Sequence, residues 1–243
     1  MTQDRTNTIA QGGATAVLHA GNARFELVRI PPGEFDMGSF DGEAKHTANE
    51  APVRRVRITR AFYLGRCEVT RGQYASVMGA GADPAGDPLP MSDVSFAQAQ
   101  AFVERLSAIT QAAVSLPTEA QWEYACRAGA PVGTDLQRVA WTRENAGGTA
   151  HPVGSLQANA WGLHDMLGNV WEYCTDFIDD YATMDDTDPV GQVTGRDGAM
   201  RGGGWMHGAE HCRPAVRLIS DDMFGGAGIR IAVSADAASE GLS

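Results

Sequence analysis

The half of the sequence that follows Arg127 contains no long helical pattern, and this feature most restricts how the chain can fold. Short apolar pieces alternate there with loops rich in Gly and Asp. The whole chain holds 29 glycines, and glycine tolerates the backbone angles that tight turns require. We therefore expect a loop-rich domain with little regular secondary structure.

Strand signals lie in the first part of the chain. Residues 25–30 predict a strand, which the Pro-Pro-Gly run at 31–33 closes. Residues 55–59 alternate between polar and apolar side chains, which predicts a strand with one face in water. Residues 62–64 continue the sheet signal. Residues 1–22 are polar and small, so we expect a flexible N-terminal arm there.

Capping residues predict the helices. Thr70 can begin a short helix, and Ser95 begins the clearest one. Apolar residues between Phe96 and Ile109 recur at spacings of three and four, which places them on one helix face. Thr118 opens a capping box for a further helix. Since no linker separates the halves, we expect one α+β domain over residues 23–243.

Composition narrows the classes of partner. The formal charge of −11 argues against nucleic acid, because a phosphate backbone is bound through an excess of cations. No apolar run reaches the roughly 18–20 residues that span a bilayer, so we expect no membrane partner. The first residues show no cationic patch before an apolar stretch, so we expect no secretory signal and a cytoplasmic location. The four cysteines form no CxxC spacing, which disfavours a structural zinc site.

The segment from Leu163 to Tyr173 holds candidate calcium ligands. Asp165 and Glu172 offer carboxylate oxygens on either side of a turn at Gly168, and calcium accepts backbone carbonyls beside carboxylates. The carboxylates of Asp165 and Glu172 with the carbonyls of Gly168 and Val170 can supply most of a shell. The alternative is that both acids cap turns or pair with arginines.

A second segment runs from Arg201 through three glycines to Trp205 and Met206. His207, His211 and Cys212 follow within six residues, and a thiolate with imidazoles suits a soft metal such as copper. The alternative is that Cys212 is a small core residue and that the histidines are surface groups.

Together these segments resemble the formylglycine-generating enzyme family, also called the sulfatase-modifying factor family. The matching segments occur in order over roughly residues 25–234 and are Gly33 to Gly38, Glu68 to Thr70, Gln73 with Tyr74, Pro90 to Ala97, Leu116 to Arg127, His151 to Gly154, Gly162 to Glu172, Arg201 to Trp205, Arg213 to Arg217, and Gly228 to Arg230. The resemblance implies a single compact domain with a core similar to C-type lectins. It also implies a structural calcium ion held at the four positions Asp165, Gly168, Val170 and Glu172.

The resemblance is weaker at the catalytic positions. The family's enzymes use two cysteines, five residues apart, to bind copper(I) and oxidise a substrate cysteine with oxygen. Aligned without gaps, the first of these positions holds His207 and the second holds Cys212, while Gly204 replaces a serine. We therefore expect no two-thiolate copper site. Trp171 matches an active-site tryptophan, and Cys212 can instead pack in the core near Cys126.

Two functions follow as hypotheses. One is an oxygen-dependent oxidoreductase or maturation factor that acts on a peptide, a protein or a natural product. Relatives of that kind include the pyoverdine-maturation proteins and the C-terminal part of the ergothioneine-pathway sulfoxide synthases. In this reading His207, His211 and Cys212 hold copper or iron, and Trp171 and Trp205 wall the pocket.

The other hypothesis is a non-catalytic module that binds a ligand or a protein with the same scaffold. The acidic stretch 176–188 and the turn 206–210 then form its rim. Arg213 and Arg217 can grip a substrate carboxylate or phosphate with two parallel hydrogen bonds, or can pair with buried acids of the fold. The residues indicate neither a particular substrate nor an oligomeric state.

Overall fold

The computed structural model describes residues 10–12, 15–39, 42, 45–79, 86–129, 135–178, 180–181, 183–191, 198–219 and 227–235. Strands from both ends of the chain meet in one six-stranded sheet, in the order β1-β2-β3-β6-β14-β7. These strands are β1 (Ala10–Gly12), β2 (Thr15–Ala20), β3 (Ala23–Ile30), β6 (Phe62–Gly65), β7 (Val114–Ser115) and β14 (Ala232–Ser234). β14 pairs antiparallel with both β6 and β7, so the last described strand lies inside the sheet.

The prediction of a flexible arm over residues 1–22 is wrong for Ala10–Gly12 and Thr15–Ala20, which form strands β1 and β2. β2 pairs antiparallel with β3 along its whole length. Leu18 and two alanines of β2 are buried, but alanine is small, so the hydrophobic signal in the sequence is weak. Residues 1–9 and 13–14 of the predicted arm lie outside the described residues.

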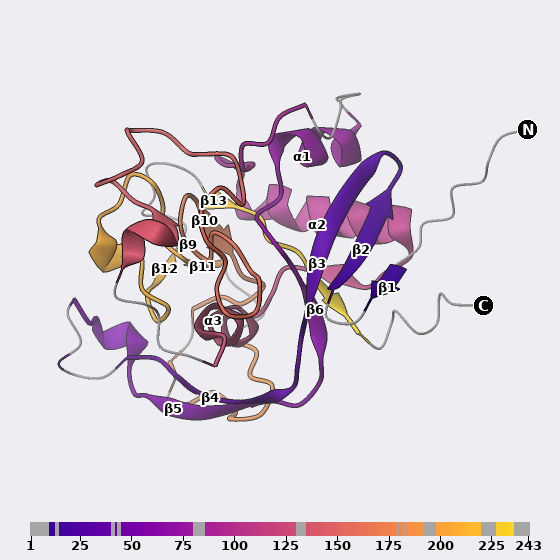
Figure 1. Ribbon diagram of the computed structural model, residues 1–243. Helices are drawn as coiled ribbons and strands as arrows, with labels where there is room; N and C mark the ends of the chain where they lie inside the picture. The colour runs from indigo at the N-terminus through magenta and orange to yellow at the C-terminus, as the bar shows by residue number, and fades with distance from the viewer. Residues whose placement is uncertain are drawn as a thin grey trace, which may run out of the picture.

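The predicted helices are confirmed, each with a capping box. They are α1 (Arg71–Met78), α2 (Phe96–Thr110) and α3 (Glu119–Arg127), and their caps are Thr70, Ser95 and Thr118. In each case the cap hydroxyl accepts from the N3 backbone N–H, while the N3 glutamine accepts from the cap N–H. Figure 1 shows α2 crossing behind the β2–β3 hairpin, where its apolar face fills one hydrophobic core.

A second core lies between α3 and a hairpin that runs beneath it in Figure 1. The hairpin consists of β4 (Gly33–Met37) and β5 (Arg54–Ile58). The predicted alternation in β5 is confirmed, since Val56 and Ile58 are buried and Arg55 and Arg57 are exposed. Gly33 has no room for a side chain, because an added Cβ would lie 2.3 Å from the hydroxyl of Tyr124.

After α3, the described chain forms short strands and 3-10 helices joined by loops. A four-stranded sheet holds β10 (Trp171–Tyr173), β11 (Ala199–Arg201), β12 (Arg217–Ile219) and β13 (Ala227–Gly228). A two-stranded one pairs β8 (Ala140–Trp141) with β9 (Leu167–Gly168). The 3-10 helices of this half cover Leu136–Arg138 and Ala209–His211, and a further one, Ala48–Glu50, lies between β4 and β5. The candidate residues of the sequence therefore lie mainly in this loop-rich half.

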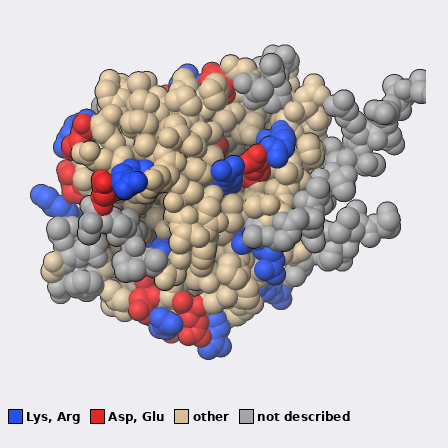
Figure 2. All heavy atoms as spheres, in the orientation of Figure 1, with Lys and Arg blue, Asp and Glu red and all other residues tan. Residues whose placement is uncertain are grey.

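Within the described ranges, no helix has both the length and the apolar character that a membrane span requires. On the face drawn in Figure 2, charged side chains occur in small clusters that mix both signs, with uncharged surface between them.

Candidate functional site

Trp171 and His207 are joined by a hydrogen bond. Trp171 lies on β10, and its indole N–H donates to Nδ1 of His207 at 3.3 Å. The two rings meet edge to face with centroids 5.6 Å apart. An indole nitrogen only donates, so Nδ1 of His207 accepts and the neutral imidazole carries its proton on Nε2. His207 is therefore held as a neutral donor beside the tryptophan.

The surroundings of His207 also favour the neutral form. Its ring is half-buried, and that burial lowers its pKa, with further lowering from His211 and Arg143. The ring of His211 lies edge to face with that of His207, at 5.5 Å between centroids. Both histidines belong to the turn that ends in the 3-10 helix Ala209–His211.

Cys212 is a core residue in this structure. Its side chain is 2% exposed, and burial raises the pKa of the thiol to about 12. The sulfur lies against the backbone of Gly203, where an added Cβ would be 2.6 Å from Sγ. Cys126 and Cys212 belong to the same hydrophobic core, and both are free thiols. Metals bind the thiolate, and burial disfavours that form of Cys212 when no metal is bound.

The trio His207, His211 and Cys212 is not gathered around one point. Among the described residues, no three His, Cys, Asp or Glu side chains are placed to hold a metal ion together. The metal site predicted from this trio stays a prediction. The core alternative for Cys212 agrees with its burial.

Trp205 and Met206 lie on the surface of the same turn. Trp205 is partly exposed, and its backbone N–H donates to the carbonyl of Asn169 at 2.8 Å. Met206 is 40% exposed, which is unusual for a large apolar side chain. Gly204 lies close to both rings beneath, since an added Cβ would lie 3.3 Å from Trp171 and 3.6 Å from Nδ1 of His207. The turn thus presents an apolar, partly exposed surface above the Trp171–His207 pair.

In the predicted calcium segment, Glu172 is fully engaged by protein groups. Arg230 donates to both of its carboxylate oxygens, at 2.6 and 2.8 Å, and the indole N–H of Trp122 donates to one of them at 2.7 Å. This agrees with the alternative that Glu172 pairs with an arginine. These contacts use both lone pairs of Oε2 and one lone pair of Oε1, so one lone pair of Oε1 stays open to a cation.

Asp165 is in a different situation. Its Oδ2 accepts from the backbone N–H of Gly154 at 2.6 Å, but Oδ1 is buried without a hydrogen-bond partner. Oε2 of Glu68 is likewise buried without a partner. Burial raises the pKa of both carboxyl groups, and the charge of Asp165 raises that of Glu68 further. A side-chain hydrogen bond with Glu68 lowers the pKa of Asp165 against the effect of burial, so the two neighbouring acids can share a proton in the interior.

This arrangement fits a bound cation. A buried carboxylate without a partner is costly unless a proton or a metal ion compensates it. The oxygens of Asp165 and Glu68 are the hard donors that calcium prefers. Sequence reasoning missed Glu68 as a candidate ligand, although it lies in the quoted Glu68–Thr70 motif, because its closeness to Asp165 is a tertiary contact.

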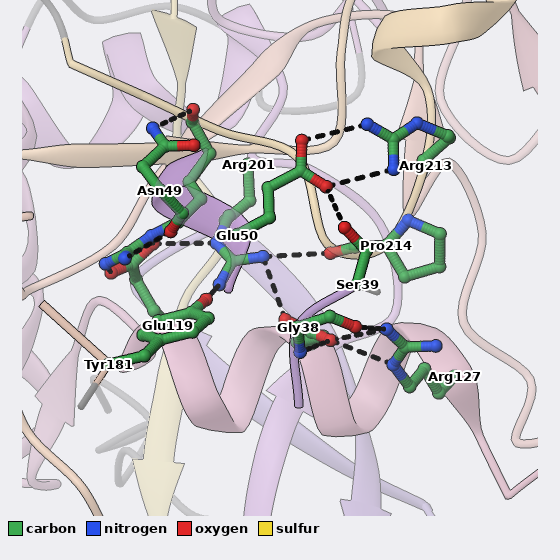
Figure 3. Close-up of polar contacts among 12 residues, drawn as sticks. Gly38, Ser39, Asn49, Glu50, Glu119, Arg127, Tyr181, Arg201, Arg213 and Pro214 are labelled. Carbon is green, nitrogen blue, oxygen red and sulfur yellow. Dashed lines mark hydrogen bonds and ion pairs between the residues drawn. The ribbon is translucent and has the colours of Figure 1, made fainter. Parts of the chain in front are cut away.

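Arg213 and Arg217, the predicted substrate-binding arginines, pair with acids of other segments, and Figure 3 shows this for Arg213. Arg213 donates to both carboxylate oxygens of Glu50, at 2.9 and 3.0 Å. Arg217 is 1% exposed and donates to both oxygens of Glu119. The buried Arg217 is therefore out of a substrate's reach, whereas Arg213 is only partly buried, and the alternative of pairing with buried acids describes the contacts of both.

The same network continues through Arg201. Its guanidinium donates to Glu119 at 2.8 Å, to Glu123 at 3.1 Å, to the carbonyl of Pro214 at 2.8 Å and to the hydroxyl of Tyr181 at 2.7 Å (Figure 3). Burial raises the pKa of Glu119, but Arg217 and Arg201 outweigh it and hold this pKa below its usual value. The first turn of α3 thus anchors the loop-rich half.

The acidic stretch 176–188 folds onto other elements in its described part. Asp176 is buried and accepts from the backbone N–H groups of Glu119 and Gly191. Asp188 accepts from the backbone N–H of Thr59 at 2.8 Å. These acids therefore contribute to packing in addition to any role as a rim.

Comparison with known proteins identifies the family. The Sulfatase-modifying factor enzyme 1-like domain matches residues 19–235, which is most of the chain. The chain belongs to the sulfatase-modifying factor family. It is 28% identical to the formylglycine-generating enzyme of Streptomyces coelicolor, over 86% of this chain and 89% of that protein.

Solved structures of similar fold superpose well on this chain. PvdO from Pseudomonas aeruginosa gives a TM-score of 0.81 at 25% identity, over 93% of this chain and all of that one. Treponema denticola variable protein 1 gives a TM-score of 0.77 at 23% identity, over 92% of this chain and 100% of that one. The predicted α+β, loop-rich fold with a C-type-lectin-like core is therefore confirmed, as is the predicted family.

Proposed function

We propose that this member of the family binds a peptide or protein segment at the surface formed by Trp205, Met206 and His207, over the buried ring of Trp171, without two-thiolate copper chemistry. The observation that carries this proposal is the state of Cys212. Cys212 is the only thiol of the turn, and it is buried and protonated. His207 occupies the first of the two positions at which the family's enzymes have a cysteine. A site of this kind recognises a partner more readily than it activates oxygen.

The chemistry of the surface supports a peptide or protein partner. Trp205 and Met206 offer partly exposed apolar area, and tryptophan and methionine are enriched where proteins meet. Beside them, Nε2–H of His207 is left as a donor that can meet a backbone carbonyl.

A structural calcium ion is part of the proposal. Asp165 and Glu172 would hold it with the carbonyls of Gly168 and Val170, and Glu68 would add its buried oxygen. The three carboxylates would draw closer together on binding, because no three acidic side chains of the described residues already surround one point. The unpartnered oxygens of Asp165 and Glu68 support this assignment. Bound there, calcium would neutralise the buried acids and fix the segment that leads into β10.

An oxygen-dependent oxidoreductase or maturation factor is the second candidate. The closeness of two imidazoles favours it, because the rings of His207 and His211 lie 5.5 Å apart at their centroids. In that case the histidines would hold copper or iron with a group of the substrate, and Cys212 would stay in the core. Its substrate would again be a peptide, a protein or a natural product.

One set of measurements separates the candidates. The protein and its Cys212→Ser, His207→Ala and His211→Ala variants are loaded separately with copper(I), iron(II) and calcium, and bound metal and oxygen uptake are quantified. The binding proposal expects calcium alone, with the same content in all four proteins. Stoichiometric copper or iron that disappears in the histidine variants, together with oxygen uptake, would establish the oxidoreductase instead.

The binding surface is tested directly with an immobilised peptide library. We expect bound peptides to be lost in Trp205→Ala and weakened in His207→Ala. Val53→Ala is the matched control. Val53 is an apolar residue outside the turn, and at 42% it is about as exposed as Met206. Equal binding by the wild type and Trp205→Ala would overturn the proposal.

A further inference from the structure

Two cavities meet at an ionic ridge on the β2–β3 hairpin. Cavities of about 340 and 400 Å³ share four lining residues, namely Arg24, Glu26, Arg66 and His164. None of the four belongs to the turn at Trp205 or to the residues proposed to hold calcium. Cavities of this volume are in the range that takes small molecules.

The ridge carries a net positive charge. Arg24 and Arg66 both donate to the carboxylate of Glu26, the latter at 2.7 Å. Arg66 also lies 3.2 Å from Nε2 of His164. The other ring nitrogen of His164 lies 2.8 Å from the carbonyl of Leu156, so Nδ1 donates and Nε2 accepts in a neutral imidazole. Two guanidinium groups thus face one carboxylate.

Both guanidinium groups can accept a further anion. Their side chains are 54% and 47% exposed for Arg24 and Arg66. A guanidinium has five N–H donors, and the contacts described here use one from Arg24 and two from Arg66. Carboxylates are the natural partners of such a planar fork of donors.

The walls behind the ridge are uncharged over much of their area. The smaller cavity is lined by Val69, Val153 and Ile231, with the thiol of Cys67, and the larger one by Val17, Leu27 and Trp161. Burial raises the pKa of Cys67 to about 12, so its thiol is neutral. Glu68 also lines the smaller cavity and, with Asp165 nearby, makes its inner end unfavourable for an anion. A ligand would therefore point its apolar body inward and its anionic group outward.

From these features we infer that this ridge and its cavities form a second binding site, which takes a carboxylate attached to a small apolar body. The carboxylate pairs with Arg24 and Arg66, and the apolar part enters one of the flanking cavities. A free aryl or alkyl acid and the C-terminus of a peptide ending in an apolar residue share this chemistry.

Calorimetric titration tests the site with 3-phenylpropanoate and with N-acetyl-glycyl-leucine, each compared with its neutral amide. We expect both acids to bind. Each neutral amide should bind about threefold to tenfold more weakly than its acid. Tighter binding of the free acid or of the dipeptide identifies the source of the carboxylate. Absence of binding by both acids, or equal binding of acids and amides, would overturn the inference.

Variants locate the ligand. Arg66→Gln should weaken the binding of both acids. Glu26→Gln should strengthen their binding, because it removes the carboxylate that competes for both arginines. An unfolded variant cannot bind more tightly, so the opposite signs separate recognition from structural damage. Arg55→Gln is the matched control, since Arg55 is 59% exposed and pairs with Glu34 and Asp36 on the β4–β5 hairpin.

Alkylation of Cys67 provides an independent readout. Cys67 is partly exposed, whereas Cys126, Cys174 and Cys212 are buried. Binding in the smaller cavity should slow its reaction with iodoacetamide at alkaline pH, and binding in the larger cavity should protect Trp161 from fluorescence quenching by acrylamide. A bound acid that changes neither the alkylation of Cys67 nor the quenching of Trp161 would show that the ligand lies elsewhere and would refute the site.

Discussion

Arg230 and Glu172 form a buried ion pair with two parallel hydrogen bonds, at 2.6 Å between Nη2 and Oε1 and at 2.8 Å between Nε and Oε2. The same guanidinium donates to the carbonyls of Gly65 and His164, at 2.8 and 2.9 Å. One side chain thus joins the end of β6, the loop before β9 and the proposed calcium segment.

Removal of Arg230 should strongly destabilise the protein. Arg230→Met leaves the carboxylate of Glu172 buried with only the indole of Trp122, so we expect a loss of about 3–5 kcal/mol in the free energy of unfolding. Urea denaturation measures it. Arg55→Met, in an exposed pair, should change stability by less than about 0.5 kcal/mol. A loss below about 1 kcal/mol for Arg230→Met would contradict this account.

Calcium should stabilise the fold through Glu68 and Asp165. At a calcium concentration 100 times the dissociation constant, the expected gain is about 2.7 kcal/mol, and EDTA should reverse it. Glu68→Gln should remove most of this gain, because the amide cannot supply a charged ligand. Glu104→Gln, on the exposed side of α2, should retain it. The measurement is the unfolding midpoint with and without calcium, and equal gains in the two variants would argue against the assigned ligands.

Asp176 should make stability depend on pH. Burial, and then the charge of Glu119, raise the pKa of Asp176 from 3.8 to about 6. Between about pH 4 and about pH 6, Asp176 is therefore protonated in the folded state and ionised in the unfolded state. Its contribution to the free energy of unfolding falls as the pH rises through this range. The full change is about 3 kcal/mol and stays lost above pH 6.

The comparison of wild type with Asp176→Asn isolates this effect, because asparagine does not titrate. The difference between their free energies of unfolding should decline over that pH range and then level off. A difference that is constant from pH 4 to pH 7 would show that Asp176 has an ordinary pKa.

Gly203 should be irreplaceable next to Cys212. In Gly203→Ala the new Cβ would lie 2.6 Å from Sγ of Cys212 and 2.9 Å from the carbonyl of His211, in a backbone conformation with φ of +84°. Gly147→Ala is the matched control, because φ is +64° there and no atom lies within 4 Å of the added Cβ. We expect a loss of about 1 kcal/mol in the control and about 2–4 kcal/mol at Gly203. Equal losses would mean that Cys212 moves aside freely.

Much of the local structure could be predicted from the sequence. The capping boxes at Thr70, Ser95 and Thr118 and the alternation along β5 involve neighbours a few residues apart, so the pattern of residue types is enough to place them. The family and its C-type-lectin-like fold also followed from ordered motifs. The strand β2 did not, because its buried positions are mostly alanine and its pairing partner decides its structure.

The candidate sites depended on tertiary structure. Sequence left open whether Arg213 and Arg217 meet a substrate or buried acids, and the fold brings Glu50 and Glu119 to them. The nearness of Glu68 to Asp165 and the hydrogen bond from Trp171 to His207 likewise join distant segments. Residue types specify which charges and donors a chain carries, but burial and long-range contacts decide which of them are satisfied and which remain available to a ligand.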